Sequence, residues 1–254
     1  MGRPEDSRVK IPAILHLTRL GYTYFSLKGL ESGVDYDGDT NVFYHQFCDA
    51  LNAINDAELD IPQTKNLIEE IKIKLSNDDL GKSFFQILHG EINGYKLIDF
   101  AHPERNTLNV TTELPYENGE DNFRPDVIAL INGMPLSFIE VKRQNNRDGI
   151  LAERERMMRR FSNKIYRRFA NITQFTVFSN NNEYDDTDIE PIQGAFYAAS
   201  SYEKMFFSKF REERSEELIK GIKELDEDIE SFVLKDNNLQ AIKGTPEISI
   251  PHTC

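Results

Sequence analysis

Hydrophobic positions in the first ninety residues recur at helical spacing. The stretches "IPAILHLTRLGY" (residues 11–22) and "TNVFYHQFCDALNAIN" (40–55) predict two amphipathic helices, the second capped by Thr40 or Asn41. The stretches "TKNLIEEIKIKL" (64–75) and "DDLGKSFFQILHG" (78–90) predict two more, the latter with Gly90 as its C-cap. Residues 1–76 are therefore expected to form a helical region packed on the core.

The hydrophobic period changes after residue 90. Short runs rich in β-branched and aromatic residues predict a meander of four strands, namely "GYKLIDF" (94–100), "TLNVTTELPY" (107–116), "DVIALIN" (126–132) and "PLSFIEVK" (135–142). Residues 149–169 return to a helical pattern, and "QFTVFSN" (174–180) and "GAFYAAS" (194–200) predict two later strands. A helix that crosses between strands favours an α/β fold with a central mixed β-sheet flanked by helices.

Polar and charged segments flank the last predicted strand, and the chain has little pattern after residue 236. Residues 180–191 read as an acidic loop, and the Glu-rich stretch 211–234 predicts a charged helix with a solvated face. We expect a core over residues 77–200, a C-terminal helical region over 201–235, and a connector over 236–254 that leads into a longer protein.

Composition narrows the class of protein. The chain has 254 residues, of which 39% are hydrophobic, enough to bury a large core. Its two cysteines, Cys48 and Cys254, are too few for a disulfide framework, so we expect a reducing cytoplasm. The sequence predicts no membrane span and no secretory signal.

Charge is unevenly distributed. The segment from Lys142 to Arg168 carries ten Lys and Arg residues against three Asp and Glu residues, whereas the whole chain has a formal net charge of −13. Such polarisation indicates one face that binds an anionic partner such as a phosphate backbone. A solvated amphipathic helix would explain this segment equally well.

Two carboxylates and a lysine lie within the apolar stretch "RPDVIALINGMPLSFIEVK" (124–142). Asn132-Gly133 favours a two-residue hairpin turn, which would place Asp126 and Glu140 on opposite faces. A longer connection or a one-residue bulge shifts the pairing so that Asp126 lies opposite Glu140, and Pro135 suits such an irregularity. We therefore predict that the simple turn is interrupted near Pro135.

If they converge, these residues have the chemistry of a cation site. Two close carboxylates need positive charge between them, which Mg²⁺ supplies with oxygen ligands from Asp126, Glu140 and the backbone carbonyl of Val141. Lys142, on the same face, would position water or stabilise charge on a phosphodiester. The alternative is an ordinary ion pair on a half-exposed strand. Glu113 could approach the cation from the neighbouring strand, although a surface carboxylate is the commoner outcome.

Pro125-Asp126 and Glu140-Val141-Lys142 resemble the PD-(D/E)xK nuclease motif. The wider context "KLIDFAHPERNTLNVTTELPY" and "FRPDVIALINGMPLSFIEVKRQNN" is similar to the N-terminal endonuclease domain of the restriction (R) subunit of type I restriction enzymes. The resemblance is strongest over residues 77–200. It implies a restriction-endonuclease-like core that cleaves double-stranded DNA with Mg²⁺, in which Asp126 and Glu140 bind the metal and Lys142 is catalytic.

The resemblance also implies partners. In that family an ATP-driven motor follows the nuclease, so ATP is expected only in a motor that this chain lacks, and modification and specificity subunits select the target. The family's Gln-x-x-x-Tyr element has no match in "AERERMMRRFSNKIY", and arginines such as Arg156 or Arg160 could take its role. The expected DNA contacts are Arg143, Arg147, Arg156, Arg159 and Arg160. The alternatives are a non-catalytic DNA-binding or subunit-docking module and a stand-alone nuclease with another target.

Overall fold

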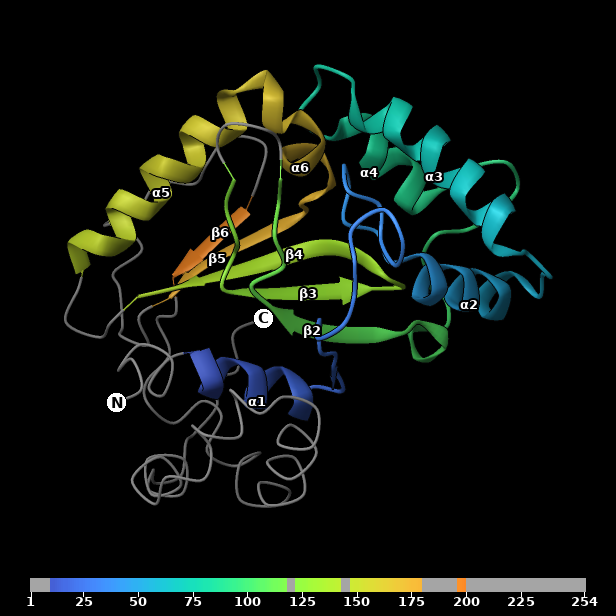
Figure 1. Cartoon of the computed structure of the whole chain (residues 1–254), viewed down its shortest axis with the longest axis horizontal. Helices are drawn as coiled ribbons and strands as arrows, with labels where there is room; N and C mark the ends of the chain where they lie inside the picture. The colour runs from blue at the N-terminus through green and yellow to red at the C-terminus, as the bar shows by residue number, and fades with distance from the viewer. Residues whose placement is uncertain (1–9, 118–121, 143–146, 180–195, 200–254) are drawn as a thin grey trace.

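A six-stranded mixed sheet forms the centre of the computed structural model, which describes residues 10–117, 122–142, 147–179 and 196–199 (Figure 1). The strands lie in chain order: β1 (Thr23–Tyr24), β2 (Leu108–Thr112), β3 (Val127–Ile131), β4 (Met134–Val141), β5 (Phe175–Ser179) and β6 (Phe196–Ala199). Strands β2, β3 and β4 pair antiparallel, while β1 pairs parallel with β2, and β5 parallel with both β4 and β6. The predicted α/β class with a mixed sheet is confirmed.

Helices cover both faces of this sheet (Figure 1). They are α1 (Ile11–Arg19), α2 (Tyr44–Asn55), α3 (Ile61–Leu75), α4 (Lys82–His89), α5 (Arg147–Ser162) and α6 (Arg167–Ile172), with short 3₁₀ turns at Pro103–Arg105 and Lys164–Tyr166. Helix α1 packs on the face that carries Val127 and Ile139. Helices α5 and α6 pack on the opposite face, where Ile128 and Phe138 form an apolar cluster with Met157 and Phe169. Helices α2, α3 and α4 extend this second layer over the start of β4.

Of two helix ends predicted from the sequence, one differs in the structure and one agrees. Helix α2 begins after Phe43, not at Thr40 or Asn41. Asp37 accepts hydrogen bonds from the backbone and hydroxyl of Thr40, and Asn41 adopts a left-handed conformation, so both residues close the preceding loop instead. Gly90 is the C-cap of α4 as predicted.

The helix predicted over residues 149–169 is interrupted. Its first part is α5, after which the Asn163 side chain accepts a hydrogen bond from the backbone of Ile165 and starts a 3₁₀ turn. Helix α6 then begins at Arg167. The break lets Tyr166 and Phe169 both reach the aromatic cluster against the sheet.

The strand predicted over residues 94–100 is wrong. Only a short bridge joins Ile92 and Tyr95 in this region, and Leu97 is buried without joining the sheet. Beyond Leu97 the backbone amides form hydrogen bonds with side chains. The Asp99 carboxylate accepts from the backbone amides of Ala101 and His102, and the backbone amide of Asp99 donates to the side chain of Asn106. Such local bonds replace a strand ladder.

The hairpin between β3 and β4 combines a simple turn with a bulge. Asn132 and Gly133 both have positive φ angles, 52° and 75°, as a two-residue turn of this kind requires. Ile131 pairs with Met134 and Leu130 with Pro135, but Ala129 pairs with Ser137, so Leu136 is the extra residue. The turn itself is intact, contrary to our prediction. The shift in pairing that we predicted is nevertheless present, one step further along β4.

Several predictions lie outside the described residues: the acidic loop, the charged helix over 211–234 and the connector. The division of the chain at residues 76, 200 and 235 also stays a prediction. Within the described part, no helix is both long enough and apolar enough to cross a membrane.

Candidate active site

The bulge determines where the charged residues of the hairpin lie. Beyond Leu136 the pairs Ala129–Ser137 and Val127–Ile139 continue in one register, which carries Asp126 opposite Glu140. Side chains alternate along a strand, so both share the face of Ile128 and Phe138, toward α5. Lys142 follows on the same face, two residues after Glu140. The three residues therefore meet at the end of the β3–β4 pair, as the shifted register predicted.

Short contacts join these residues. The Oδ2 atom of Asp126 accepts a hydrogen bond from the backbone N–H of Val141 at 2.8 Å, which holds the Asp126 side chain across the end of the hairpin. The Nζ atom of Lys142 lies 3.1 Å from Glu140 Oε1 and 3.1 Å from the carbonyl oxygen of Val141. The Lys142 backbone N–H donates to Ser179 O, so β5 fixes this end of β4.

Helix α5 adds a third carboxylate, Glu153, which the sequence motif did not include. Its Oε2 atom lies 3.4 Å from Lys142 Nζ and 3.1 Å from Arg156 Nη1. The residue is 2% exposed. A sequence signal was available: Glu153 lies four residues before buried Met157, on the apolar stripe of an otherwise polar helix.

The surroundings of Glu140 and Lys142 raise the pKa values of both side chains. Burial, and next the Asp126 carboxylate, raise the pKa of Glu140 to about 7, against the opposing effect of Lys142. Burial lowers the pKa of Lys142, but Glu140, Glu153 and Asp126 together raise it by more, so the net pKa is raised. Lys142 is therefore an ammonium donor at neutral pH. Glu140 is poised to lose its proton when a further cation arrives.

The residues present fit a hard divalent cation. Asp126 and Glu140 face one another, and the Asp126 charge adds to burial in raising the pKa of Glu140, while the Val141 carbonyl oxygen lies beside Lys142 Nζ. Within the described ranges, no three Asp, Glu, His or Cys side chains converge closely enough to bind an ion without other ligands. Water would have to complete the coordination, as is usual for Mg²⁺.

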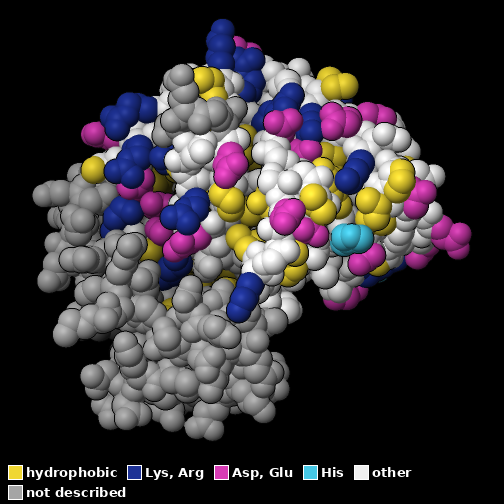
Figure 2. Space-filling model, viewed as in Figure 1, with side chains coloured by type: hydrophobic (Ala, Val, Ile, Leu, Met, Phe, Trp, Pro, Cys, Tyr) yellow, Lys and Arg dark blue, Asp and Glu magenta, His cyan; other side chains and the backbone are white. Residues whose placement is uncertain are grey.

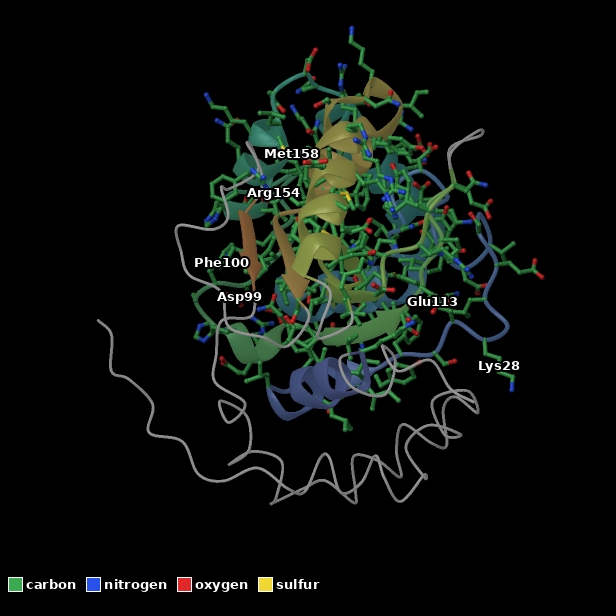
Figure 3. All side chains as sticks on the ribbon, turned by 90° about the vertical axis from the view of Figure 1, so that its left-hand side faces the viewer. Lys28, Asp99, Phe100, Glu113, Arg154 and Met158 are labelled. Atoms are coloured by element: carbon green, nitrogen blue, oxygen red, sulfur yellow. The ribbon has the colours of Figure 1, made fainter. Side chains whose placement is uncertain are left out.

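The predicted DNA-contacting arginines occupy different environments. Arg156 pairs with Glu153, and the Arg160 guanidinium lies 4.0 Å from the centre of the Phe123 ring. Arg159 is exposed, and Arg147 begins α5, whereas Arg143 lies outside the described residues. Lys and Arg side chains gather over α5 in Figure 2, and Figure 3 shows Arg154 and Met158 along one flank of this helix.

Glu113 does not join the site. It has a left-handed backbone conformation (φ 53°) just after β2, and its carboxylate pairs with Lys10 and, at 3.6 Å, with Arg124. It follows directly on the end of β2, and its side chain is labelled in Figure 3. These ion pairs and the exposure of Glu113 favour the alternative of a surface carboxylate.

Residues 3–186 match the family described as "Type I restriction enzyme R protein N terminus". The chain belongs to this family. The match includes Asp126, Glu140, Lys142 and Glu153, and it agrees with the resemblance that the motif and its context suggested.

Two proteins of Methanocaldococcus jannaschii are similar to this type I restriction enzyme family member. One, the putative type I restriction enzyme MjaVIIIP endonuclease subunit, is 34% identical over 85 residues, which cover 34% of this chain and 8% of that protein. The other, the putative MjaIXP endonuclease subunit, is 29% identical over 171 residues, which cover 54% of this chain and 15% of that protein. The chain therefore matches only a small part of the length of these relatives.

Proposed function

We propose that this chain is the nuclease part of a type I restriction enzyme and hydrolyses DNA phosphodiester bonds with Mg²⁺. The observation that carries the proposal is the shifted register of β3 and β4, which brings Asp126 opposite Glu140 with Lys142 on the same face. An accidental Glu-x-Lys pair on a strand would not need a second carboxylate opposite it. The family membership and the endonuclease subunits among the relatives support the same function.

Each residue has a distinct task in this proposal. Asp126, Glu140 and the Val141 carbonyl would hold Mg²⁺, which supplies positive charge to the scissile phosphate and to the attacking water. Lys142 donates hydrogen bonds from an ammonium that its carboxylate neighbours keep protonated. It would orient the nucleophile or stabilise the charge that develops on the phosphate. The backbone N–H of Val141 keeps Asp126 in place for this purpose.

Helix α5 would guide the DNA backbone to the site. It begins close after Lys142, packs on the face where the three residues meet, and contains Arg156, Arg159 and Arg160. Phosphate contacts of this kind fix the position of a duplex without reading its sequence. The acidic remainder of the chain would repel DNA elsewhere, so binding is confined to this face.

The wider assembly follows from the family. We propose that double-stranded DNA is the substrate, that modification and specificity subunits select the target, and that ATP acts only in a motor outside this chain. The relatives are much longer than the matched segment, which leaves room for such a motor.

A plasmid assay tests the proposal. Supercoiled plasmid is incubated with the chain over a range of Mg²⁺ concentrations, alongside Glu140→Gln, Lys142→Gln and the matched control Glu155→Gln, an exposed acid of α5. We expect nicked and linear DNA from the wild type and the control, and a loss of at least about 100-fold in rate for the two site variants. Equal cleavage by all four proteins would show that the site is not catalytic.

A second candidate is a DNA-binding or docking module without catalysis. The ion pairs of Lys142 with both Glu140 and Glu153 favour it, because they already balance part of the acidic charge. This candidate predicts that the chain shifts DNA in a gel but leaves it intact with Mg²⁺ or Mn²⁺, and that Glu140→Gln changes nothing.

A further inference from the structure

Glu153 occupies an unusual position for a carboxylate. It lies on the inner stripe of α5 with Met157, which is fully buried, and Glu153 itself is 2% exposed. Burying a carboxylate is costly unless cations or hydrogen-bond donors compensate it. Apolar residues would serve a purely structural helix face better, so the environment of Glu153 requires a specific explanation.

The two oxygens of Glu153 have different surroundings. Oε2 forms ion pairs with Lys142 Nζ at 3.4 Å and with Arg156 Nη1 at 3.1 Å. Oε1 is buried and has no hydrogen-bond partner within the part of the chain that the structure describes. A buried carboxylate oxygen normally has a donor, so Oε1 is left ready to accept one more hydrogen bond.

The charges around Glu153 also indicate that this part of the protein can accept a further cation. Three acidic side chains (Asp126, Glu140 and Glu153) meet two cationic side chains (Lys142 and Arg156), so one negative charge is in excess at the end of the hairpin whenever all three are ionised. Lys142 bridges Glu140 and Glu153. A divalent cation bound by Glu140 would compete with Lys142 for that carboxylate, and Glu153 would then still hold the ammonium of Lys142.

We propose that Glu153 is a third acidic residue of the cation site, which retains Lys142 through Oε2 and accepts from the hydrated cation through Oε1. This inference rests on the proposed function, because it assigns the cation itself to Asp126 and Glu140. Glu153 acts through water and through Lys142, in agreement with the absence of a three-carboxylate cluster among the described residues.

Binding of Mn²⁺ without DNA tests the inference apart from catalysis. Free Mn²⁺ is measured by electron paramagnetic resonance during titration of the wild type, Glu140→Gln, Glu153→Gln and the control Glu155→Gln. Partners that reach a metal through water typically affect its affinity about 10- to 100-fold. We expect at least about a tenfold loss for Glu153→Gln, a larger loss for Glu140→Gln and no change for Glu155→Gln.

The pair Lys142→Gln and Lys142→Gln/Glu153→Gln separates the two roles of Glu153 and remains informative if Glu153→Gln alone does not fold. Lys142→Gln should bind Mn²⁺ more tightly than the wild type, since the competing ammonium is gone, and the added Glu153→Gln should weaken binding again. Thermal unfolding of each variant without metal checks that the site is folded.

The outcomes distinguish this inference from the proposed function. If Glu140→Gln weakens Mn²⁺ binding but neither form carrying Glu153→Gln does, the inference is overturned while the cation site stands. If Glu153→Gln has no effect in the Lys142→Gln background, Glu153 acts on the lysine alone and its assignment to the cation is wrong. If the wild type binds no Mn²⁺, both the inference and the proposed metal site fail.

Discussion

Substitution of Gly133 by alanine should destabilise the protein through a contact that the turn makes with α2. Gly133 has a φ angle of +75°, and its carbonyl accepts a hydrogen bond from Phe43 N at 3.0 Å. A Cβ atom at this position would lie 2.7 Å from the backbone N of Phe47 and 3.1 Å from Phe43 O. Since both are backbone atoms at the start of a helix, the turn or the helix must move.

Two separate effects are expected to destabilise the Gly133→Ala variant. The left-handed conformation costs an alanine roughly 1–2 kcal/mol, and overpacking against rigid neighbours costs about 1–3 kcal/mol. Gly133→Ala is therefore expected to lower the free energy of unfolding by about 2–5 kcal/mol. Gly94 is a matched control, because its φ is +80° and a Cβ atom added there would meet no described atom within 4 Å. Gly94→Ala should cost only roughly 1–2 kcal/mol.

Equilibrium unfolding in guanidinium chloride, followed by circular dichroism, gives the difference between the two variants. Effects of alanine on the unfolded chain are similar at the two positions and largely cancel. The remaining difference of about 1–3 kcal/mol measures the contact with α2. Equal losses for Gly133→Ala and Gly94→Ala would refute the reasoning, and would mean that the turn does not pack on α2 as the structure shows.

Three further predictions concern charge. Because the folded-state pKa of Glu140 is raised to about 7 from an ordinary 4.5, the free energy of unfolding should fall by up to about 3 kcal/mol as pH rises through this window. In metal-free buffer, urea unfolding of Glu140→Gln should lack this part of the pH dependence. Lys72 is buried against Asp37 at 2.5 Å, so Lys72→Met should cost about 3–5 kcal/mol in urea unfolding, whereas exposed Lys74→Met should cost under about 0.5 kcal/mol. Arg159→Ala should reduce the slope of log affinity against log salt by about 1 in a DNA-binding titration, and an unchanged slope would exclude a phosphate contact.

Local periodicity was sufficient to predict most of the elements. The β-branched and aromatic content of "DVIALIN" and "PLSFIEVK" and the helical spacing before residue 90 are properties of short segments, and they predicted β3, β4 and the first four helices. The error over residues 94–100 has a physical cause. Side chains of Asp99 and Asn106 satisfy the backbone there, which hydrophobic pattern does not reveal.

The sequence by itself determined the fold class and the candidate set of Asp126, Glu140 and Lys142. It also showed that strand pairing must shift by one residue if these three side chains are to converge. Tertiary structure decided that the extra residue is Leu136, beyond an intact turn, because that turn docks on α2 through Gly133. It also decided that Glu153 joins Lys142, since this depends on how α5 packs across the sheet. Pairing and helix docking join residues that are distant in the chain, and no local pattern specifies them.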